Sequence, residues 1–520
     1  EDGAVPVIDE AKLPQHMYAM LAATAGVTSV SVAGDTVDAL PVMIPSTKSV
    51  FGEAHYSFTL APTLGFDHAE ATGAALPANY ELAAWAPDAL LGPAWPAIYA
   101  ALGSAIHNDY PVIEGLLNAV HLDHSITLEY TPEQMLERGI TTIDVTSHVA
   151  AVDESSSGRI VTVALELKAN GEHVGSTQER FAIRGRATGN RTPSEAAPFG
   201  GAKVEVVDTP RSVLRRVSVK APDDMTPFAI VSGDYNPIHT SYAAAKVAGM
   251  DAPLVHGMWL SATAQHAAEA VVAGQGGAQI AGWTYYMYGT VDLNDEVEIT
   301  VERVGRVVGG GLSLEVTCRI NKQVVSRASA YTFAPKVAYV YPGQGIQSAG
   351  MGLDERTKSK AVDEVWRRAD AHTRSAMGFS ILAIVRDNPT EIVARGVTYR
   401  HPEGVLNLTQ FTQVALATLA IGQTARMREE GVLVPGAAFA GHSLGEYDAL
   451  AAYAEVFPLE TVLDLVFQRG STMHSLVPRD ENGRSNYRMG ALRPNQFGVD
   501  DAHVVEYVDS IAQASGEFLQ

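Results

Sequence analysis

The residue pair in this sequence that best fits chemistry is Asp234 and His239, which lie five positions apart with Pro237 between them. Proline has a fixed φ and no amide hydrogen, so the segment should form a rigid turn that holds both side chains in one orientation. An imidazole with an ordinary pKa of about 6.5 suits a general base. A carboxyl group whose pKa is raised in an apolar tunnel suits a general acid. Removal of water from a 3-hydroxyacyl thioester needs both, one to take the α proton and one to protonate the departing hydroxyl.

A donor for the thioester oxygen is predicted at Gly257, about 17 residues after the histidine, where Val255-His256-Gly257 precedes a helix-like stretch. The Gly257 amide has no intrahelical partner there and lies at the positive end of the helix dipole. The absence of a side chain lets a substrate approach. Taken alone, the Asp–His segment fits an Asx-type turn before a capped helix equally well. The added histidine–glycine pair favours catalysis.

A known family shares these motifs. Residues 233–262, GDYNPIHTSYAAAKVAGMDAPLVHGMWLSA, resemble the hydratase motif of the MaoC-like, (R)-specific enoyl thioester hydratases, and the resemblance extends over residues 205–335. Those proteins have the hot-dog fold, in which an antiparallel sheet wraps around a helix. The resemblance implies that Asp234 and His239 form the catalytic dyad. It also implies that the Gly257 amide binds the carbonyl and that Asn236 is an orienting residue.

The order of predicted elements occurs twice, which indicates an internal duplication with a period of about 150 residues. In each half a helix-like stretch, 95–102 or 258–272, precedes several β-like runs rich in Val, Ile and Thr. The runs that close the two halves, 163–182 and 314–334, also look alike. We therefore predict an α+β tandem hot-dog fold.

The first half, residues 47–195, lacks the D-x-N-P-x-H pattern that the second half, residues 196–335, contains. Families with two fused hot dogs resemble this arrangement, since one half keeps the dyad and the other shapes the acyl pocket. The first half is therefore expected to be non-catalytic. Its segment His121-Leu122-Asp123-His124 fits a metal site or a solvated loop, and the lack of a third ligand favours the loop. Residues 186–201, rich in Gly, Pro, Ser and Thr, are predicted to be a linker.

A second chemical motif, Gly441-His442-Ser443-Leu444-Gly445, follows an apolar strand and precedes a helix, as a nucleophile elbow requires. The glycines permit a sharp turn that exposes the Ser443 hydroxyl. The Leu444 amide would then be placed to bind an oxyanion. A second amide is expected from Gln344, on a Gly-rich loop that follows the first strand of an α/β domain.

The stretches GHSLGEY (441–447) and YPGQG (341–345) resemble the malonyl/acyl transferases of fatty acid synthesis. FTQVAL (411–416) resembles the TQPAL stretch of that family, with valine in place of proline, so Gln413 would line the site. The resemblance implies that Arg469 holds the free carboxylate of a malonyl group, for which a bidentate guanidinium is well suited. A surface arginine on a helix is the alternative.

The serine also needs a base. By resemblance, the catalytic histidine of this family lies roughly a hundred residues after the serine, beyond Gln520, while His442, His474 and His503 lack the expected context. We therefore expect residues 336–520 to be an α/β-hydrolase-like malonyl/palmitoyl transferase domain that is incomplete in this chain.

The bulk composition excludes several classes of function. The 37 Lys and Arg residues against 59 Asp and Glu give a net charge of −22, which disfavours nucleic acid and anionic membranes as partners. No apolar run reaches the roughly 20 residues that span a bilayer. A single cysteine, Cys318, rules out an intrachain disulfide and suits the reducing cytoplasm. No metal or cofactor site is predicted in the chain.

A tandem hot-dog dehydratase followed by a malonyl/palmitoyl transferase resembles the type I fatty acid synthases of fungi and of mycobacteria and their relatives. The Ala-, Val- and Asp-rich composition favours an actinobacterial version. The resemblance implies that residues 1–46 are a linker or the end of a preceding enoyl reductase domain. It implies substrates carried on the phosphopantetheine of an acyl carrier domain or of CoA, with the other synthase domains as partners in a large homo-oligomer. FMN and NADPH are expected only in those other domains.

Two alternatives remain. A non-catalytic scaffold with relic motifs would have an occluded pocket around His239. A polyketide-synthase-like fragment would have a different domain order and a different dehydratase motif.

Overall fold

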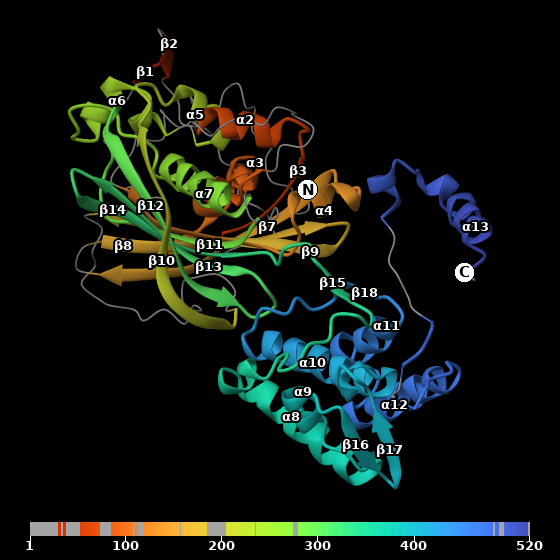
Figure 1. The fold of residues 1–520 in the computed structure, drawn as a ribbon. Helices are drawn as coiled ribbons and strands as arrows, with labels where there is room; N and C mark the ends of the chain where they lie inside the picture. Colours follow the sequence, from red (N-terminus) through yellow and green to blue (C-terminus); the bar gives the residue numbers. More distant parts are fainter. Residues whose placement is uncertain are drawn as a thin grey trace. The chain divides into compact units, whose positions relative to one another are not determined.

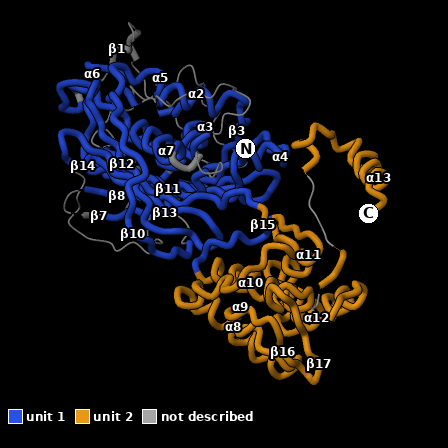
Figure 2. The backbone as a smooth tube through the Cα atoms, in the orientation of Figure 1, with its two compact units in different colours: residues 1–337, 430–437 blue, residues 338–429, 438–520 orange. Residues whose placement is uncertain are grey.

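The computed structural model of this chain describes residues 30–32, 35–37, 52–72, 85–107, 110–112, 119–155, 158–184, 204–234, 236–273, 279–481, 484–487 and 493–517. The predicted linker 186–201 and most of residues 1–46 lie outside the described residues. The chain divides into two compact units (Figure 2): Glu1–Val337 with Glu430–Ala437, and Ala338–Glu429 with Ala438–Gln520.

The first unit contains one ten-stranded antiparallel sheet, in the order β10-β12-β13-β14-β11-β6-β9-β8-β7-β3. The order of the first five strands matches that of the last five counted from the opposite edge, which confirms the predicted duplication. The halves join where β11 pairs with β6, with Gly282 opposite Thr127. The strands are β3 (Glu53–Thr59), β6 (Ala119–Leu128), β7 (Thr142–Ser155), β8 (Gly158–Ala169), β9 (Glu172–Arg184), β10 (Val206–Lys220), β11 (Ile280–Met287), β12 (Glu296–Val307), β13 (Leu312–Ile320) and β14 (Gln323–Thr332).

Each half supplies one long helix that lies against the sheet, α3 (Leu91–Ser104) and α7 (Gly257–Ala273) (Figure 1). In the first half, helix α3 contacts β3 and β7. In the second half, α7 contacts β10 to β13. Both helices are rich in buried alanine, which lets their backbones lie close to the strands, and one hydrophobic core spans both halves. A helix that is apolar on most sides is expected to be enclosed. The arrangement is the predicted hot-dog fold, present twice.

Shorter elements surround these helices. They are β1 (Val30–Val32), β2 (Asp35–Val37), α2 (Leu64–Ala71), η3 (Pro87–Leu90), β4 (Ile106–His107), β5 (Tyr110–Pro111), α4 (Pro132–Glu137), α5 (Thr226–Ser232), η5 (Pro237–His239) and α6 (Tyr242–Val247).

The second unit has two parallel strands, β15 (Ala338–Tyr341) and β18 (Ala438–Gly441), with helices packed around α10. Strands followed by helices are the predicted α/β pattern. No helix in the described part of the chain is long and apolar enough to cross a membrane. The remaining elements are η6 (Asp354–Thr357), α8 (Lys360–His372), η7 (Thr373–Met377), α9 (Ile381–Asp387), β16 (Glu391–Ala394), β17 (Val397–Arg400), η8 (Val405–Asn407), α10 (Thr409–Glu429), α11 (Leu444–Asp448), η9 (Ala449–Tyr453), α12 (Leu459–Ser475), η10 (Pro494–Phe497), η11 (Asp501–His503) and α13 (Val504–Ser515).

Candidate active site

A tight turn between α5 and η5 positions the predicted dyad. Helix α5 ends at Ser232 and is capped by Gly233, whose φ of +66° favours glycine, and Asp234 follows directly. The Asp234 carboxylate accepts a hydrogen bond from the Asn236 amide at 3.1 Å, and the Asn236 side chain accepts one from the Ile238 amide at 3.3 Å. The Asx-type turn considered as an alternative is therefore present, and it is also what holds Asp234 and His239 in place.

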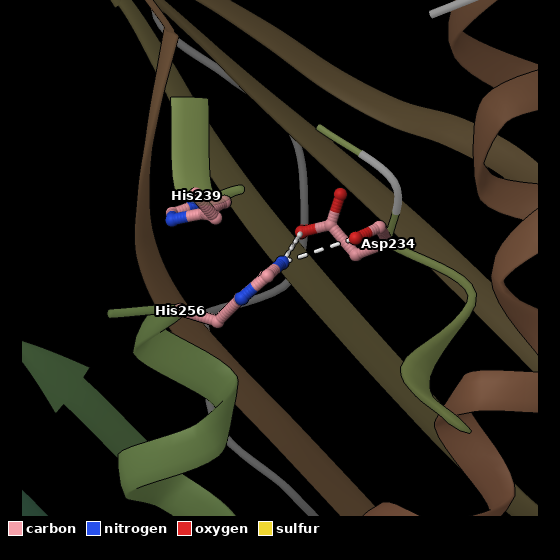
Figure 3. A group of neighbouring side chains, drawn as sticks. All are labelled: Asp234, His239 and His256. Carbon is pink, nitrogen blue, oxygen red and sulfur yellow. Dashed lines mark hydrogen bonds and ion pairs between the residues drawn. The ribbon is translucent and has the colours of Figure 1, made fainter. Parts of the chain in front are cut away.

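Three side chains meet at this turn: Asp234, His239 and His256 (Figure 3). The His239 and His256 rings are stacked, with centroids 3.8 Å apart. Nε2 of His256 donates to the backbone oxygen of Asp234 at 3.0 Å and lies 3.8 Å from its carboxylate. Nδ1 of His239 lies 2.8 Å from the carbonyl oxygen of Leu254, so Nδ1 carries the proton and Nε2 is the free acceptor.

The first half contributes directly to this group through Tyr99 of α3, whose hydroxyl donates to Oδ1 of Asp234 at 2.8 Å. Tyr99 and His256 were both missed by sequence reasoning. The motif containing His256 was recognised, but only Gly257 was assigned a role. Tyr99 is 135 positions from Asp234 and belongs to no motif, so nothing in the sequence points to it.

The charges of the dyad differ from the prediction for the carboxyl group. Burial raises the pKa of Asp234, but His256, His239 and the hydrogen bond from Tyr99 together outweigh it, and the pKa is lowered. The expected raised pKa is therefore wrong. Burial lowers the pKa of His239 despite the neighbouring carboxylate, and burial with His239 lowers that of His256 to about 3. The resting site thus holds one ionised carboxylate and two neutral imidazoles at neutral pH.

The dyad opens on a cavity of about 170 Å³ that both halves line. Asp234, His239 and Gly257 come from the second half, while Trp95 and Tyr99 are among those from the first. An occluded pocket around His239, as a relic scaffold predicts, is not observed.

Gly257 begins α7 at the wall of this cavity, so its amide lies beyond the reach of intrahelical carbonyls. A Cβ atom at this position would lie 2.4 Å from Sδ of Met287, so that side chain would have to move. A larger residue here would therefore displace the flexible end of the Met287 side chain, which also lines the cavity.

The same three residues are also the group that comes nearest to a metal site in the described part of the chain. Their ligand atoms all lie within 4.8 Å of one another. However, the planes of the His239 and His256 rings are only 26° apart, so the in-plane lone pairs run nearly side by side instead of converging on one point. Nε2 of His256 also acts as a hydrogen-bond donor. The geometry suits acid–base chemistry better than metal binding.

The segment from His121 to His124 is part of β6, so its interpretation as a solvated loop is wrong. His124 is fully buried between Asp88 and Glu179. A polar segment that looks like a loop can lie inside a strand here because the carboxylates of Asp88 and Glu179, both distant in sequence, form ion pairs with His124.

The predicted nucleophile elbow forms in the second unit. Ser443 follows β18 with a φ of +57°, an unfavourable backbone conformation that is typical of such turns. Gly445 approaches Tyr341 so closely that a Cβ would lie 2.0 Å from the carbonyl oxygen of Tyr341. The Arg469 guanidinium donates to Oγ of Ser443 at 2.9 Å, so Arg469 is at the serine, and the surface-arginine alternative does not hold.

The other residues predicted for this site lie around the elbow. Leu444 is fully buried at the start of α11. Nε2 of Gln413 lies 3.5 Å from Oε1 of Gln344, which brings these two predicted site residues together. Among the described residues, no histidine side chain is hydrogen-bonded to Oγ of Ser443, and His503 instead bonds Asp500.

Comparisons with known proteins match the region around each site. Residues 202–323 match the family described as MaoC like domain, and residues 338–511 match the family described as acyl transferase domain. The fatty acid synthase subunit beta of Saccharomyces cerevisiae is 34% identical over 318 residues, covering 54% of this chain and 16% of that protein. The fatty acid synthase beta subunit stcK of Emericella nidulans is 33% identical over 342 residues, covering 58% of this chain and 18% of that protein. The matched stretch is thus less than a fifth of either relative.

Among solved structures, a MaoC-like dehydratase from Phytophthora capsici is 14% identical with a TM-score of 0.41, covering 55% of this chain and 96% of that one. An acyl carrier protein S-malonyltransferase from Vibrio cholerae is 32% identical with a TM-score of 0.23, covering 28% of this chain and 41% of that one.

Proposed function

Because this chain matches a MaoC-like domain and an acyl transferase domain and is similar to fatty acid synthase beta subunits, we propose that it works in a fatty acid synthase. There its MaoC-like region dehydrates a 3-hydroxyacyl thioester to the trans-2-enoyl thioester. The observation that carries the proposal is geometric: His239, whose Nδ1 is held by the Leu254 carbonyl oxygen, and Asp234 line one cavity. The lowered pKa values of both groups favour a neutral His239 and an ionised Asp234 at neutral pH.

These charge states assign the proton transfers. Nε2 of His239 takes the α proton, and the electron pair of that C–H bond forms the C2–C3 double bond as the C3–O bond breaks. The departing oxygen takes the proton back from the His239 imidazolium and leaves as water, which restores the neutral imidazole. The sequence-based assignment of Asp234 as the acid is thereby revised, because a carboxyl group with a lowered pKa has no proton to give at neutral pH.

Asp234 instead stabilises the positive charge on His239 while the imidazole holds the proton, since one of its carboxylate oxygens lies within 4.8 Å of a ring nitrogen of each histidine. The Gly257 amide, at the N-terminus of α7, binds the thioester oxygen as negative charge develops on it. Asn236 orients the site by capping η5.

Steady-state turnover of a 3-hydroxybutyryl thioester tests the proposal. Asp234→Asn and His239→Ala should each lower kcat/KM by about 10² or more, the range for positioned acid–base groups. The exposed Asp251 supplies a matched control, and Asp251→Asn should behave as wild type. Activity within a few-fold of wild type in either dyad variant would reject the proposal.

For the second unit we propose acyl transfer through Ser443, supported by its contact with Arg469. The hydroxyl attacks the malonyl thioester while the histidine base that the family resemblance implies takes its proton. The C–S bond breaks, an ester forms on the serine, and the departing thiolate takes that proton and leaves as the thiol. Arg469 holds the free carboxylate, while the amides of Leu444 and Gln344 bind the oxyanion and Gln413 lines the site. Mass spectrometry of the whole synthase, with its histidine base present, should detect the acyl-serine after incubation with malonyl-CoA.

The partners proposed for both sites follow from these substrates. They are an acyl carrier domain that delivers acyl groups on phosphopantetheine, and the other domains of a fatty acid synthase in the cytoplasm. We propose no cofactor for either reaction, since general acid–base and nucleophilic side chains supply the chemistry.

A further inference from the structure

Four hydrogen-bonded ionisable side chains run from the core of the first unit to the wall of the cavity. His124 lies at their centre, with Nε2 2.8 Å from Asp88 and Nδ1 2.7 Å from Oε1 of Glu179. The other oxygen of Glu179 bonds Nε2 of His121 at 2.8 Å. The mechanism above uses none of these four residues.

A β-bulge brings the two histidines to the same side of the sheet. Alternation along a regular strand would place His121 and His124 on opposite faces, because they are three positions apart. The pairing of β6 with β9 shifts by one residue between His121 and Asp123, so Leu122 is an extra residue. Both imidazoles therefore reach Glu179. Bulges next to active sites commonly redirect a side chain in this way.

Ion pairs and hydrogen bonds hold the buried side chains of Asp88, His124 and Glu179 in fixed orientations. Burial alone would lower the pKa of His124, but Glu179 and Asp88 raise it to about 10. Burial alone would raise the pKa of Glu179, but His124 and the hydrogen bonds to it lower the value to about 2. Both carboxylates accept further hydrogen bonds, Glu179 from Thr177 and Asp88 from Ser261 and Gln265. Satisfied buried networks of this kind fix the orientation of their members.

His121 is the member that reaches the substrate cavity. Its side chain is 14% exposed, whereas that of Glu179 is fully buried. Its ring stacks on Phe181 at 4.7 Å, and both residues line the cavity together with Asp234 and His239. Since Nε2 is held by Glu179, Nδ1 is the nitrogen left for a ligand.

We propose that His121 is a substrate-contacting residue supplied by the first half, whose Nδ1 hydrogen-bonds the 3-hydroxyl of the thioester-linked substrate. Glu179, His124 and Asp88 position its ring. The inference rests on the proposed dehydration and assigns the first half a direct role in holding the leaving group.

Two substitutions separate substrate contact from a structural role. In His121→Asn the side-chain amide lies near the former Nδ1, whereas in His121→Gln it lies near the former Nε2 and can keep the bond to Glu179. Loss of the substrate contact should lower kcat/KM for a 3-hydroxybutyryl thioester about ten- to hundredfold in His121→Gln, and less in His121→Asn. If His121 has only a structural role, His121→Asn should lose more activity than His121→Gln, because the asparagine side chain cannot keep the bond to Glu179. His148→Gln, at an exposed histidine of β7, is the matched control and should match wild type.

Binding measured in the Asp234→Asn background gives a readout that is independent of turnover. There, His121→Gln should weaken binding of the 3-hydroxybutyryl thioester but not of the butanoyl thioester, which lacks the hydroxyl. Equal effects on both ligands, or wild-type kinetics in His121→Gln, would overturn the inference. If Asp234→Asn alone turns over like wild type, the proposed function fails instead.

Discussion

The hydrogen bond from Tyr99 to Asp234 makes the protonation state of the dyad depend on the first half. The Tyr99→Phe change removes one hydroxyl, which donates to Oδ1 of Asp234 at 2.8 Å, and keeps the ring. A hydrogen bond to a charged group contributes about 1.5–3 kcal/mol. At about 1.4 kcal/mol per pKa unit, the pKa of Asp234 should rise by roughly one to two units.

The direction of the effect on activity follows from that shift. The wild-type pKa of Asp234 is lowered, partly by Tyr99, so the carboxylate stays ionised in mildly acidic solution. In Tyr99→Phe the carboxylate becomes protonated at higher pH, so the titration of Asp234 in the kcat/KM profile should move upward by the same roughly one to two units. Protonation of the base His239 gives a separate acidic titration. The kcat/KM of Tyr99→Phe should fall much less near neutral pH than in acidic solution, because Asp234 stays ionised at neutral pH.

The assay is turnover of a 3-hydroxybutyryl thioester across the pH range, with heat denaturation to check folding. Tyr130→Phe is a matched control, because Tyr130 packs its ring against Arg138, away from the dyad. A pH profile of Tyr99→Phe in which no acidic titration moves upward, the titration of Asp234 included, would refute the assigned role of the ionised carboxylate.

Three further changes test other parts of the structure. Gly257→Ala should lower kcat/KM about tenfold or more, because the new methyl group forces Met287 to move beside the amide that binds the thioester oxygen; wild-type kinetics would contradict this. The pKa of His124 is raised from 6.5 to about 10, so its protonation stabilises the folded state fully below pH 6.5, and this contribution is lost as pH rises toward 10. Heat denaturation should show that His124→Gln loses this part of the pH dependence, and an unchanged profile would count against the buried ion pairs. Arg469→Ala should reduce acylation of Ser443 by malonyl-CoA about a hundredfold relative to acetyl-CoA, as mass spectrometry can measure, while an unchanged ratio would remove Arg469 from carboxylate binding.

Local sequence signals were sufficient for the parts of the sites that depend on short-range structure. The turn around Pro237, the helix beginning at Gly257 and the elbow at Ser443 are each set by a few consecutive residues. The duplicated order of helix and strands predicted the tandem hot-dog fold, because each half repeats the same pattern of burial.

The missed features depend on contacts between distant segments. Tyr99 reaches Asp234 only because both halves close around one cavity. His124 is buried in a strand because Asp88 and Glu179 approach it from elsewhere, and the bulge at Leu122 has no signature in the sequence. The lowered pKa of Asp234 likewise results from His256 and Tyr99, whose positions no local pattern specified.

The most direct test of the central claim is a double-variant cycle on Asp234 and His239, measured as kcat/KM for a 3-hydroxybutyryl thioester. Residues that act as one catalytic unit give non-additive losses. We predict that Asp234→Asn combined with His239→Ala loses no more activity than the more damaging single variant. Losses that multiply in the double variant, or near wild-type turnover in either single variant, would contradict a shared role in dehydration.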